Sequence, residues 1–176
     1  MDWIRRAKPV LGLLAGFLFA LLLFSCAGGS NAQNNHKVPM MVSLSVLNIS
    51  DSSPYTVELE FVLKNNTDHA YDVLKWGTPF ESGFNDNLFA VTRNGQKMDY
   101  LGRQFKRGAP TRSDFTHMAP RGEVAARIFL NDGYDLTQPG LYTVEYRKPY
   151  ISMKTDHSDP ALVPVRSNRL EIKLGH

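Results

Sequence analysis

The side chains that most often do chemistry in proteins are few and scattered in this sequence of 176 residues. Asp-His pairs occur at residues 68–69 and 156–157, but adjacent residues of a strand point to opposite faces and suit one metal ion poorly. Asp114 and His117 are three residues apart without a third ligand nearby. The sequence contains no His-Glu-x-x-His, Gly-x-Ser-x-Gly, Cys-x-x-Cys or phosphate-binding glycine loop. We therefore expect no metal, no cofactor and no catalytic residue.

A richer stretch is VLKWGTPFESGF, residues 73–84, where an apolar run leads into glycine, proline, further aromatic residues and a carboxylate. It could form the lip of an active site, but no nucleophile, base or set of metal ligands accompanies it. We expect a corner between strands, with Trp76 packed over one end of the fold. Trp76, Phe80, Glu81 and Phe84 are the side chains predicted to contact a partner.

A second candidate surface is basic. Six Lys and Arg and two Asp and Glu lie between residues 103 and 127, a local excess of four positive charges. Glycine and proline interrupt this stretch, so we expect a long loop that links two sheets. Arg103, Lys106 and Arg107, beside the aromatic Phe105, could bind an acidic partner or the head groups of a membrane. The alternative is a solvated connection with no partner.

The first 25 residues have the features of an export signal. Three basic residues precede VLGLLAGFLFALLLF, residues 10–24, which is shorter than the roughly 20 residues that span a bilayer. The sequence Leu-Phe-Ser-Cys that ends at Cys26 resembles the lipobox of bacterial lipoproteins. In that family the cysteine is acylated and the preceding peptide is removed. Since Cys26 is the only cysteine, its acylation would leave no thiol for a disulfide or for catalysis.

This resemblance divides the chain into a signal peptide (residues 1–25), a flexible tether from the lipidated Cys26 (residues 26–38) and one β-sandwich domain (residues 39–176). It implies a lipid anchor in the membrane of a bacterial cell envelope, at the outer membrane facing the periplasm if the organism has one. The alternatives are an ordinary signal peptide with a chance cysteine and an uncleaved signal anchor.

The charge of the chain gives no reason to expect nucleic acid as a partner. The full sequence has 20 Lys and Arg against 17 Asp and Glu, for a net charge of +3. Residues 1–25 hold three of those basic residues and one of the acidic ones, so the remainder carries a net charge of +1. Nucleic-acid binding needs a clustered basic footprint, and the basic isoelectric point belongs largely to the export signal.

Hydrophobic and polar residues alternate in short segments, which is the pattern of half-buried strands. In one of them Val42, Leu44 and Val46 are predicted to share the buried face. Residues 149–164 show no clear pattern and are predicted to be a loop before the last strand. We expect an all-β fold, an immunoglobulin-like antiparallel β-sandwich of about 7–8 strands. The predicted strands are residues 41–49, 55–65, 70–76, 88–93, 96–102, 123–130, 140–148 and 168–174.

Two local signals agree with this sandwich. Asn94-Gly95 suits the type I′ turn of a two-residue hairpin. Tyr142 follows a Pro-Gly turn and opens a strand, so it could form a tyrosine corner whose hydroxyl bonds to upstream backbone, or it could be an ordinary strand residue. The predicted core comprises Leu59, Phe61, Leu63, Val73, Phe89, Val91, Ile128, Leu130, Tyr142 and Val144.

The order of these motifs resembles a known module. Residues 73–124, followed by YDLTQPGLYTVEYR at 134–147, are similar to the N-terminal β-sandwich, propeptide-like domain of the deuterolysin-type (aspzincin) metalloendopeptidases. RSNRLEIKL, residues 166–174, is similar to the last strand of that domain. The resemblance covers about residues 42–174, and residues 76–81 with Lys106-Arg107 are its most specific blocks.

In that family a catalytic domain with His-Glu-x-x-His follows this module, and the motif does not occur in this sequence. The resemblance therefore implies a non-catalytic, lipid-anchored binding module that inhibits or assists a peptidase in trans. The alternatives are an envelope lipoprotein with no protease partner, and a sandwich-type serine protease inhibitor that inserts residues 77–84 or 102–112 into its target. An enzyme with a site among the scattered histidines is a fourth hypothesis, which metal analysis or mutation would test.

Overall fold

The computed structural model describes residues 39–50, 52–155 and 158–175. The predicted signal peptide, the tether and the lipid-bearing Cys26 lie outside the described residues, so they stay predictions. No helix among the described residues is long and apolar enough to cross a membrane.

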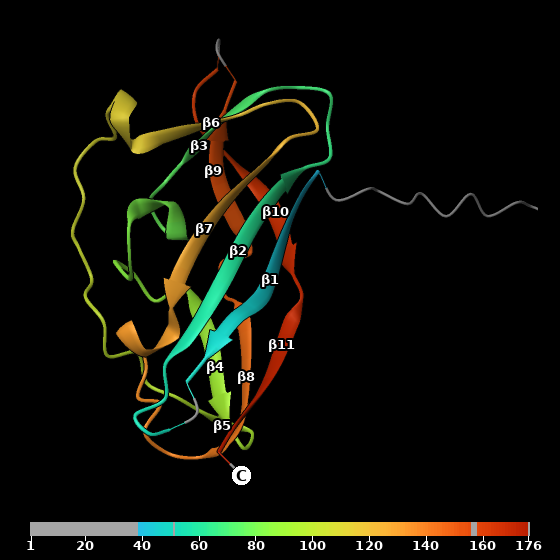
Figure 1. The fold of residues 1–176 in the computed structure, drawn as a ribbon. Helices are drawn as coiled ribbons and strands as arrows, with labels where there is room; N and C mark the ends of the chain where they lie inside the picture. Colours follow the sequence, from blue (N-terminus) through green and yellow to red (C-terminus); the bar gives the residue numbers. More distant parts are fainter. Residues whose placement is uncertain (1–38, 51, 156–157, 176) are drawn as a thin grey trace, which may run out of the picture. The chain divides into compact units, whose positions relative to one another are not determined.

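The described residues form eleven strands and three short 3-10 helices, and the predicted all-β, sandwich-like fold is confirmed. One sheet has seven strands in the order β6-β3-β9-β10-β1-β2-β7, and the other has four in the order β11-β8-β4-β5. Figure 1 shows β1, β2 and β7 in front of β4 and β8. The strands are β1 (Met40–Ile49), β2 (Val57–Asn65), β3 (Tyr71–Leu74), β4 (Phe89–Arg93), β5 (Gln96–Lys97), β6 (Phe115–Met118), β7 (Glu123–Phe129), β8 (Gly140–Tyr146), β9 (Tyr150–Lys154), β10 (Ala161–Ser167) and β11 (Arg169–Leu174), and the 3-10 helices are η1 (Pro79–Glu81), η2 (Arg112–Asp114) and η3 (Leu130–Asp132).

The core lies between the two sheets and follows the alternation of the sequence. In β2, Leu59, Phe61 and Leu63 are fully buried, while Glu60 and Val62 between them are only partly buried. All ten residues predicted for the core are buried. The Phe61 ring packs edge-on against Phe80 at 5.5 Å and against Tyr146 at 5.1 Å between ring centroids. The core therefore reaches the 73–84 corner through Phe80.

Residues 149–164 are not a loop, as the sequence predicts, but contain β9 and most of β10. Ile151 and Met153 of β9 are buried and alternate with partly exposed neighbours. Pro164 interrupts the pattern in β10 at the point where this strand changes partner. Residues 161–164 pair antiparallel with β9, and residues 165–167 pair parallel with β1, so the sandwich is not wholly antiparallel.

The buried face of β1 is shorter than predicted. Val42 and Leu44 are buried, but Val46 is 37% exposed. The register of β1 on β2 shifts between Val46 and Asn48, as at a β-bulge, and β10 pairs with β1 only as far as Val42. Asn168 replaces a strand partner beyond that point, since its side-chain amide exchanges hydrogen bonds of 2.7 and 2.9 Å with the Leu44 backbone.

The predictions made for the turns are more accurate than the prediction made for the long loop. Asn94 and Gly95 both have positive φ, 49° and 80°, as a type I′ turn requires. The tyrosine corner is confirmed, because the Tyr142 hydroxyl donates to the Gln138 carbonyl at 2.6 Å. The strand predicted over residues 96–102 is only β5. The loop predicted over residues 103–127 contains β6, and its end overlaps the strand predicted over residues 123–130, which is confirmed as β7.

Candidate partner-binding surface

The corner formed by residues 75–84 is held in place by hydrogen bonds. Gly77 adopts a φ of 70°, and its carbonyl accepts a hydrogen bond of 2.6 Å from the Tyr146 hydroxyl of β8. The buried Thr78 caps η1: its hydroxyl accepts from the Phe80 amide at 3.2 Å and donates to the Lys75 carbonyl at 2.6 Å. A local cap at Thr78 and a long-range hydrogen bond from Tyr146 therefore fix the backbone of this corner.

Two of the aromatic residues predicted to contact a partner lie on the inner side of this corner. Phe84 is only 6% exposed and packs against Phe89, Tyr100 and Tyr134, so its prediction as a partner-binding residue is wrong. Phe80 is half-buried, because its ring rests on Phe61. Both rings therefore anchor the corner to the hydrophobic core.

Residues 101–111 form an extended segment along one edge of the domain, which we call the strap (Figure 1). At its start the Leu101 amide donates to the Gly133 carbonyl at 2.9 Å, and the Tyr100 hydroxyl lies 3.2 Å from the Phe84 carbonyl oxygen. After its end, the Asp114 carbonyl accepts from the Lys75 amide at 2.8 Å. The strap is thus fixed at both ends.

Asp114 joins the strap to Trp76. One of its carboxylate oxygens accepts from the Trp76 indole Nε1 at 3.1 Å, and the other accepts from the Thr111 amide at 2.7 Å and hydroxyl at 2.6 Å. The hydrogen bonds from Thr111 are the main reason why the pKa of Asp114 is below its usual value. Asp114 was a weak candidate metal ligand in the sequence, and the structure gives it this capping role.

Arg107 is the centre of the surface. Its guanidinium forms an ion pair with Glu81 and lies over the rings of Trp76 and Phe105, at 5.2 and 5.8 Å from their centroids. The Glu81 side chain is 16% exposed, and burial raises the pKa of its carboxyl, which the charge of Arg107 only partly offsets. The structure therefore brings together Trp76, Glu81 and Arg107, three residues that the sequence selected independently.

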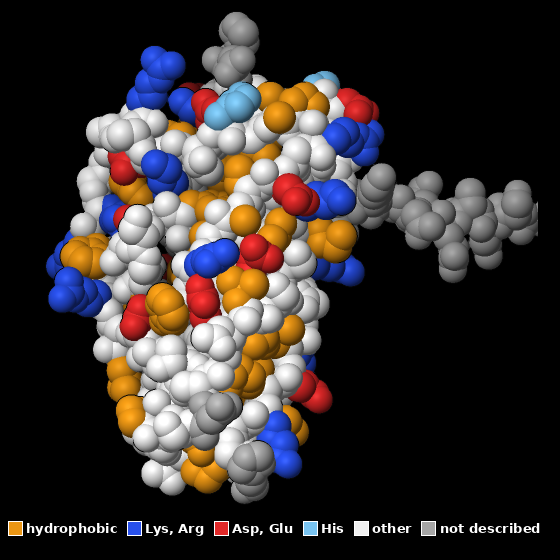
Figure 2. Space-filling view, in the orientation of Figure 1, with side chains coloured by type: hydrophobic (Ala, Val, Ile, Leu, Met, Phe, Trp, Pro, Cys, Tyr) orange, Lys and Arg blue, Asp and Glu red, His pale blue; other side chains and the backbone are white. Residues whose placement is uncertain are grey.

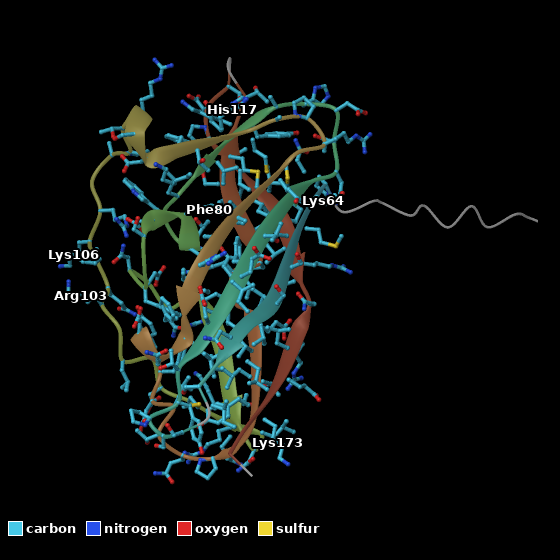
Figure 3. All side chains as sticks on the ribbon, in the orientation of Figure 1. Lys64, Phe80, Arg103, Lys106, His117 and Lys173 are labelled. Carbon is cyan, nitrogen blue, oxygen red and sulfur yellow. The ribbon has the colours of Figure 1, made fainter. Side chains whose placement is uncertain are left out.

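Arg103 and Lys106 lie on the same strap but are exposed. Figure 3 shows both on its outer side, with Phe80 further inward and Lys173 at a distant end of the domain. No Asp or Glu in the described part of the chain forms a salt bridge with Arg103 or Lys106, so both charges are available to a partner.

A cleft of about 340 Å³ opens between the strap and the β9–β10 hairpin. Lys148 and Asp86 form an ion pair of 2.7 Å at its wall. Burial acts to raise the pKa of Asp86, but the hydrogen bond and charge of Lys148 outweigh it, so this pKa is lowered. The lining residues are Trp76, Gly77, Asp86, Phe105, Arg107, Lys148, Tyr150, Ile151, Ser152 and Leu162.

No pattern in the sequence marks Tyr150, Leu162 or Lys148 as part of this surface. Tyr150 and Leu162 belong to the hairpin predicted as a loop, and they are 53% and 70% exposed. A large exposed apolar side chain has no sequence signal of its own, since the same residue type fills the core. The pairing of β9 with β10 is what places both residues beside the strap.

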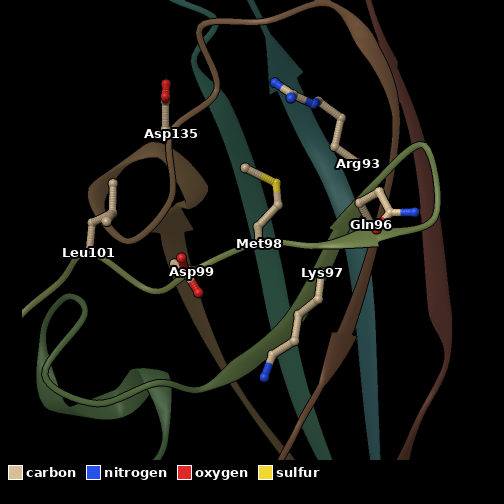
Figure 4. Close-up of a pocket in the computed structure, with 7 residues that line it drawn as sticks. All are labelled: Arg93, Gln96, Lys97, Met98, Asp99, Leu101 and Asp135. Carbon is tan, nitrogen blue, oxygen red and sulfur yellow. The ribbon is translucent and has the colours of Figure 1, made fainter.

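A second pocket, of about 310 Å³, lies beside β5 (Figure 4). Its lining combines two cations with two carboxylates, and one of these, Asp135, has a lowered pKa because the Thr137 hydroxyl and amide bond to it. The lining residues are Arg93, Gln96, Lys97, Met98, Asp99, Leu101 and Asp135. Its lining of two cations and two carboxylates gives it no net charge to select a ligand.

The histidine that the sequence placed near Asp114 has another neighbour. The His117 ring nitrogen Nδ1 lies 3.1 Å from the Asp72 carboxylate across the β3–β6 pair, and its side chain is 64% exposed. Within residues 39–50, 52–155 and 158–175, no three His, Cys, Asp or Glu side chains converge in a way that could hold a metal ion.

Comparison with known proteins points to proteases. No family model matches the chain. An extracellular protease of Aeromonas hydrophila is 29% identical over 150 residues, which is 85% of this chain and 38% of that protease. The chain thus spans well under half of its relative, and the similarity indicates a protease-related module. An X-ray structure of the Northeast Structural Genomics Consortium target SoR45 aligns over 77% of this chain and 87% of that one, with 11% identity and a TM-score of 0.41.

Proposed function

We propose that this chain is a non-catalytic, protease-associated binding module that contacts a peptidase in trans and modulates its activity. The observation that carries the proposal is the extent of the similarity to the Aeromonas protease: it takes in 85% of this chain but 38% of the protease. A module that accounts for part of a protease is suited to contact the remainder of such an enzyme.

The surface we assign to this contact is the strap together with residues 75–81 of the corner. It combines exposed cations with aromatic side chains, and aromatic residues and arginine are the types enriched at the centres of protein interfaces. Arg107 is held between Trp76 and Phe105 and paired with Glu81, so little side-chain freedom is lost when a partner binds.

The proposal includes a membrane anchor. It rests on the lipobox-like sequence that ends at Cys26, which lies outside the described residues. Acylation at this cysteine and at the new amino terminus would hold the module at an envelope membrane, since stable anchoring takes more than one acyl chain. Mass spectrometry of the native protein tests this part, and an unmodified Cys26 would contradict it.

The test of the main proposal is capture of a peptidase followed by an activity assay. The immobilised full chain is incubated with the extracellular protease of Aeromonas hydrophila and, separately, with any metalloprotease that a neighbouring gene encodes. We expect a complex, and a change in peptidase activity, that the double change Phe105→Ala and Arg107→Ala weakens and Lys173→Ala does not. Absence of a complex with either enzyme, and of any effect on activity, would overturn the proposal and leave a structural envelope protein as the better description.

A further inference from the structure

We propose that the cleft between the strap and the β9–β10 hairpin recognises an acidic peptide segment that carries one aromatic or large aliphatic anchor. This inference rests on the proposed function for the identity of the partner, which would be the peptidase that presents such a segment. The chemistry of recognition is argued from the cleft itself.

The first reason is the concentration of exposed apolar side chains. Phe105, Tyr150 and Leu162 are 52%, 53% and 70% exposed, and all three line the same cleft together with Trp76. They come from segments far apart in the sequence, the strap and the two strands of a hairpin. Single exposed apolar residues are ordinary, whereas several around one hollow mark an interaction site.

The second reason is the charge around the cleft. Arg107 and Lys148 line it, but each is already paired with a carboxylate, Glu81 and Asp86 respectively, so the net positive charge beside the cleft comes from the strap. Arg103 and Lys106 on the strap add positive charge that no described Asp or Glu pairs with. Figure 2 shows Lys and Arg side chains beside hydrophobic ones along the edge where Figure 1 places the strap. The complementary ligand is therefore negatively charged around an apolar centre.

The third reason is the size and preorganisation of the hollow. A volume of about 340 Å³ is at the low end of ligand sites, enough for one large side chain and not for a folded element. Its floor includes the buried Ile151, and its wall is the Trp76–Arg107–Phe105 stack. An anchor residue would pack against Ile151 and the exposed apolar side chains of the cleft, while flanking carboxylates would reach the cations of the strap.

The experiment uses the full chain in a non-ionic detergent and fluorescein-labelled pentapeptides, each with two glutamates on either side of Trp, Tyr, Phe or Leu. Fluorescence anisotropy measures affinity at several salt concentrations. We expect binding that weakens when serine replaces the central residue or lysine replaces glutamate. Phe105→Ala should weaken it by about tenfold or more. Lys106→Glu should weaken it by roughly fivefold and flatten its salt dependence. Lys173→Glu is the matched control for charge and should change affinity less than about twofold.

Several outcomes would overturn the proposal: no binding up to about 1 mM peptide, equal binding of the serine peptide, or equal losses for Lys106→Glu and Lys173→Glu. Circular dichroism of each variant checks that it folds. Nanodiscs test a membrane surface as the occupant. If hydrogen exchange at residues 103–107 is protected by anionic but not by neutral lipid, and the peptides do not bind, the cleft belongs to the membrane and the proposal fails.

The two proposals can fail separately. If Phe105→Ala abolishes peptide binding but no peptidase is captured, the recognition chemistry stands and the proposed function fails. If a peptidase is captured equally well by wild type and by Phe105→Ala, the proposed function stands and the cleft is not its contact site.

Discussion

The buried Tyr134 offers the sharpest test of how the structure supports the strap. This residue is 3% exposed and packs against Phe84 and Tyr100, directly beneath the start of the strap. Its hydroxyl donates to the Phe89 carbonyl at 2.6 Å, and the Asn87 amide, turned with its nitrogen inward, donates to the hydroxyl at 2.9 Å. Tyr134→Phe removes both hydrogen bonds and leaves the ring, so we expect a loss of about 1–2 kcal/mol in the free energy of unfolding at pH 8.

The same residue makes stability depend on alkaline pH. Burial raises the pKa of Tyr134 to about 12, against about 10 in an unfolded chain. A folded-state pKa above the unfolded one contributes stability that is complete below pH 10 and lost as the pH rises through 12. At about 1.4 kcal/mol per pH unit, the ionisation of Tyr134 alone removes on the order of 3 kcal/mol over this interval.

The wild-type protein should therefore lose its advantage over Tyr134→Phe as the pH rises, and the two stability curves should meet near pH 11. Urea unfolding at half-unit steps from pH 8 to about pH 11.5 measures this. Burial also raises the pKa of Tyr146, so some alkaline loss remains in the variant. Tyr150→Phe, at an exposed position, is the control. Parallel curves for wild type and Tyr134→Phe would refute the reasoning, because they would show that Tyr134 ionises equally in both states.

Three further predictions concern single hydrogen-bonded groups. Tyr142→Phe removes the tyrosine corner and should lower the free energy of unfolding by about 1 kcal/mol in urea titrations; an unchanged midpoint would contradict it. Asn168→Ala leaves both backbone groups of the buried Leu44 without their partner and should cost roughly 2–3 kcal/mol, with Asn168→Asp intermediate. The lowered pKa of Asp114 predicts that its bond to Trp76 is present above pH 4 and is lost as the pH falls below the folded-state pKa; the indole N–H resonance should shift in that range, and Asp114→Asn should abolish the shift.

The sequence predicts those parts of the fold that depend on local patterns. The alternation in β2 identifies the buried face of this strand. Asn94-Gly95 predicts the type I′ turn between β4 and β5, and the Pro-Gly turn before Tyr142 predicts the tyrosine corner. In each case the residues that decide the structure lie within a few positions of one another. Local chemistry is sufficient where the partner is near in the chain.

Prediction from the sequence fails where contacts between distant residues decide whether a residue is buried or a strand forms. Phe84 stands among glycine, serine and asparagine, as an exposed residue would, and is buried only because Tyr100 and Tyr134 fold over it. The sequence does not predict the β9–β10 hairpin, because Pro164 breaks the alternation and the place of the hairpin in the sheet depends on a parallel pairing of β10 with the start of β1. No local pattern reports such a pairing.

In the candidate site, too, the sequence indicates individual residues but not the contacts between distant ones. Glu81 and Arg107 are 26 residues apart, and the sequence selects each for its chemistry without indicating that they form a pair. The cleft requires, in addition, Tyr150 and Leu162 from the missed hairpin. The residue types of the strap and the corner mark them as candidate surfaces. Only the fold shows that the two lie side by side and that the β9–β10 hairpin completes the cleft.

The structure also distinguishes between two ways in which this surface could engage a protease. An inhibitor of the inserting type needs a loop that can enter the target, and residues 77–84 do not meet this need, because Gly77 is bonded to Tyr146 and Phe84 is in the core. On the strap, the ion pair with Glu81 holds Arg107 in the middle of the exposed residues 103–111. Insertion would break an ion pair that is partly shielded from water, whereas docking of a partner segment into the preformed cleft breaks none. The geometry therefore favours a module that receives part of its partner over one that inserts into it.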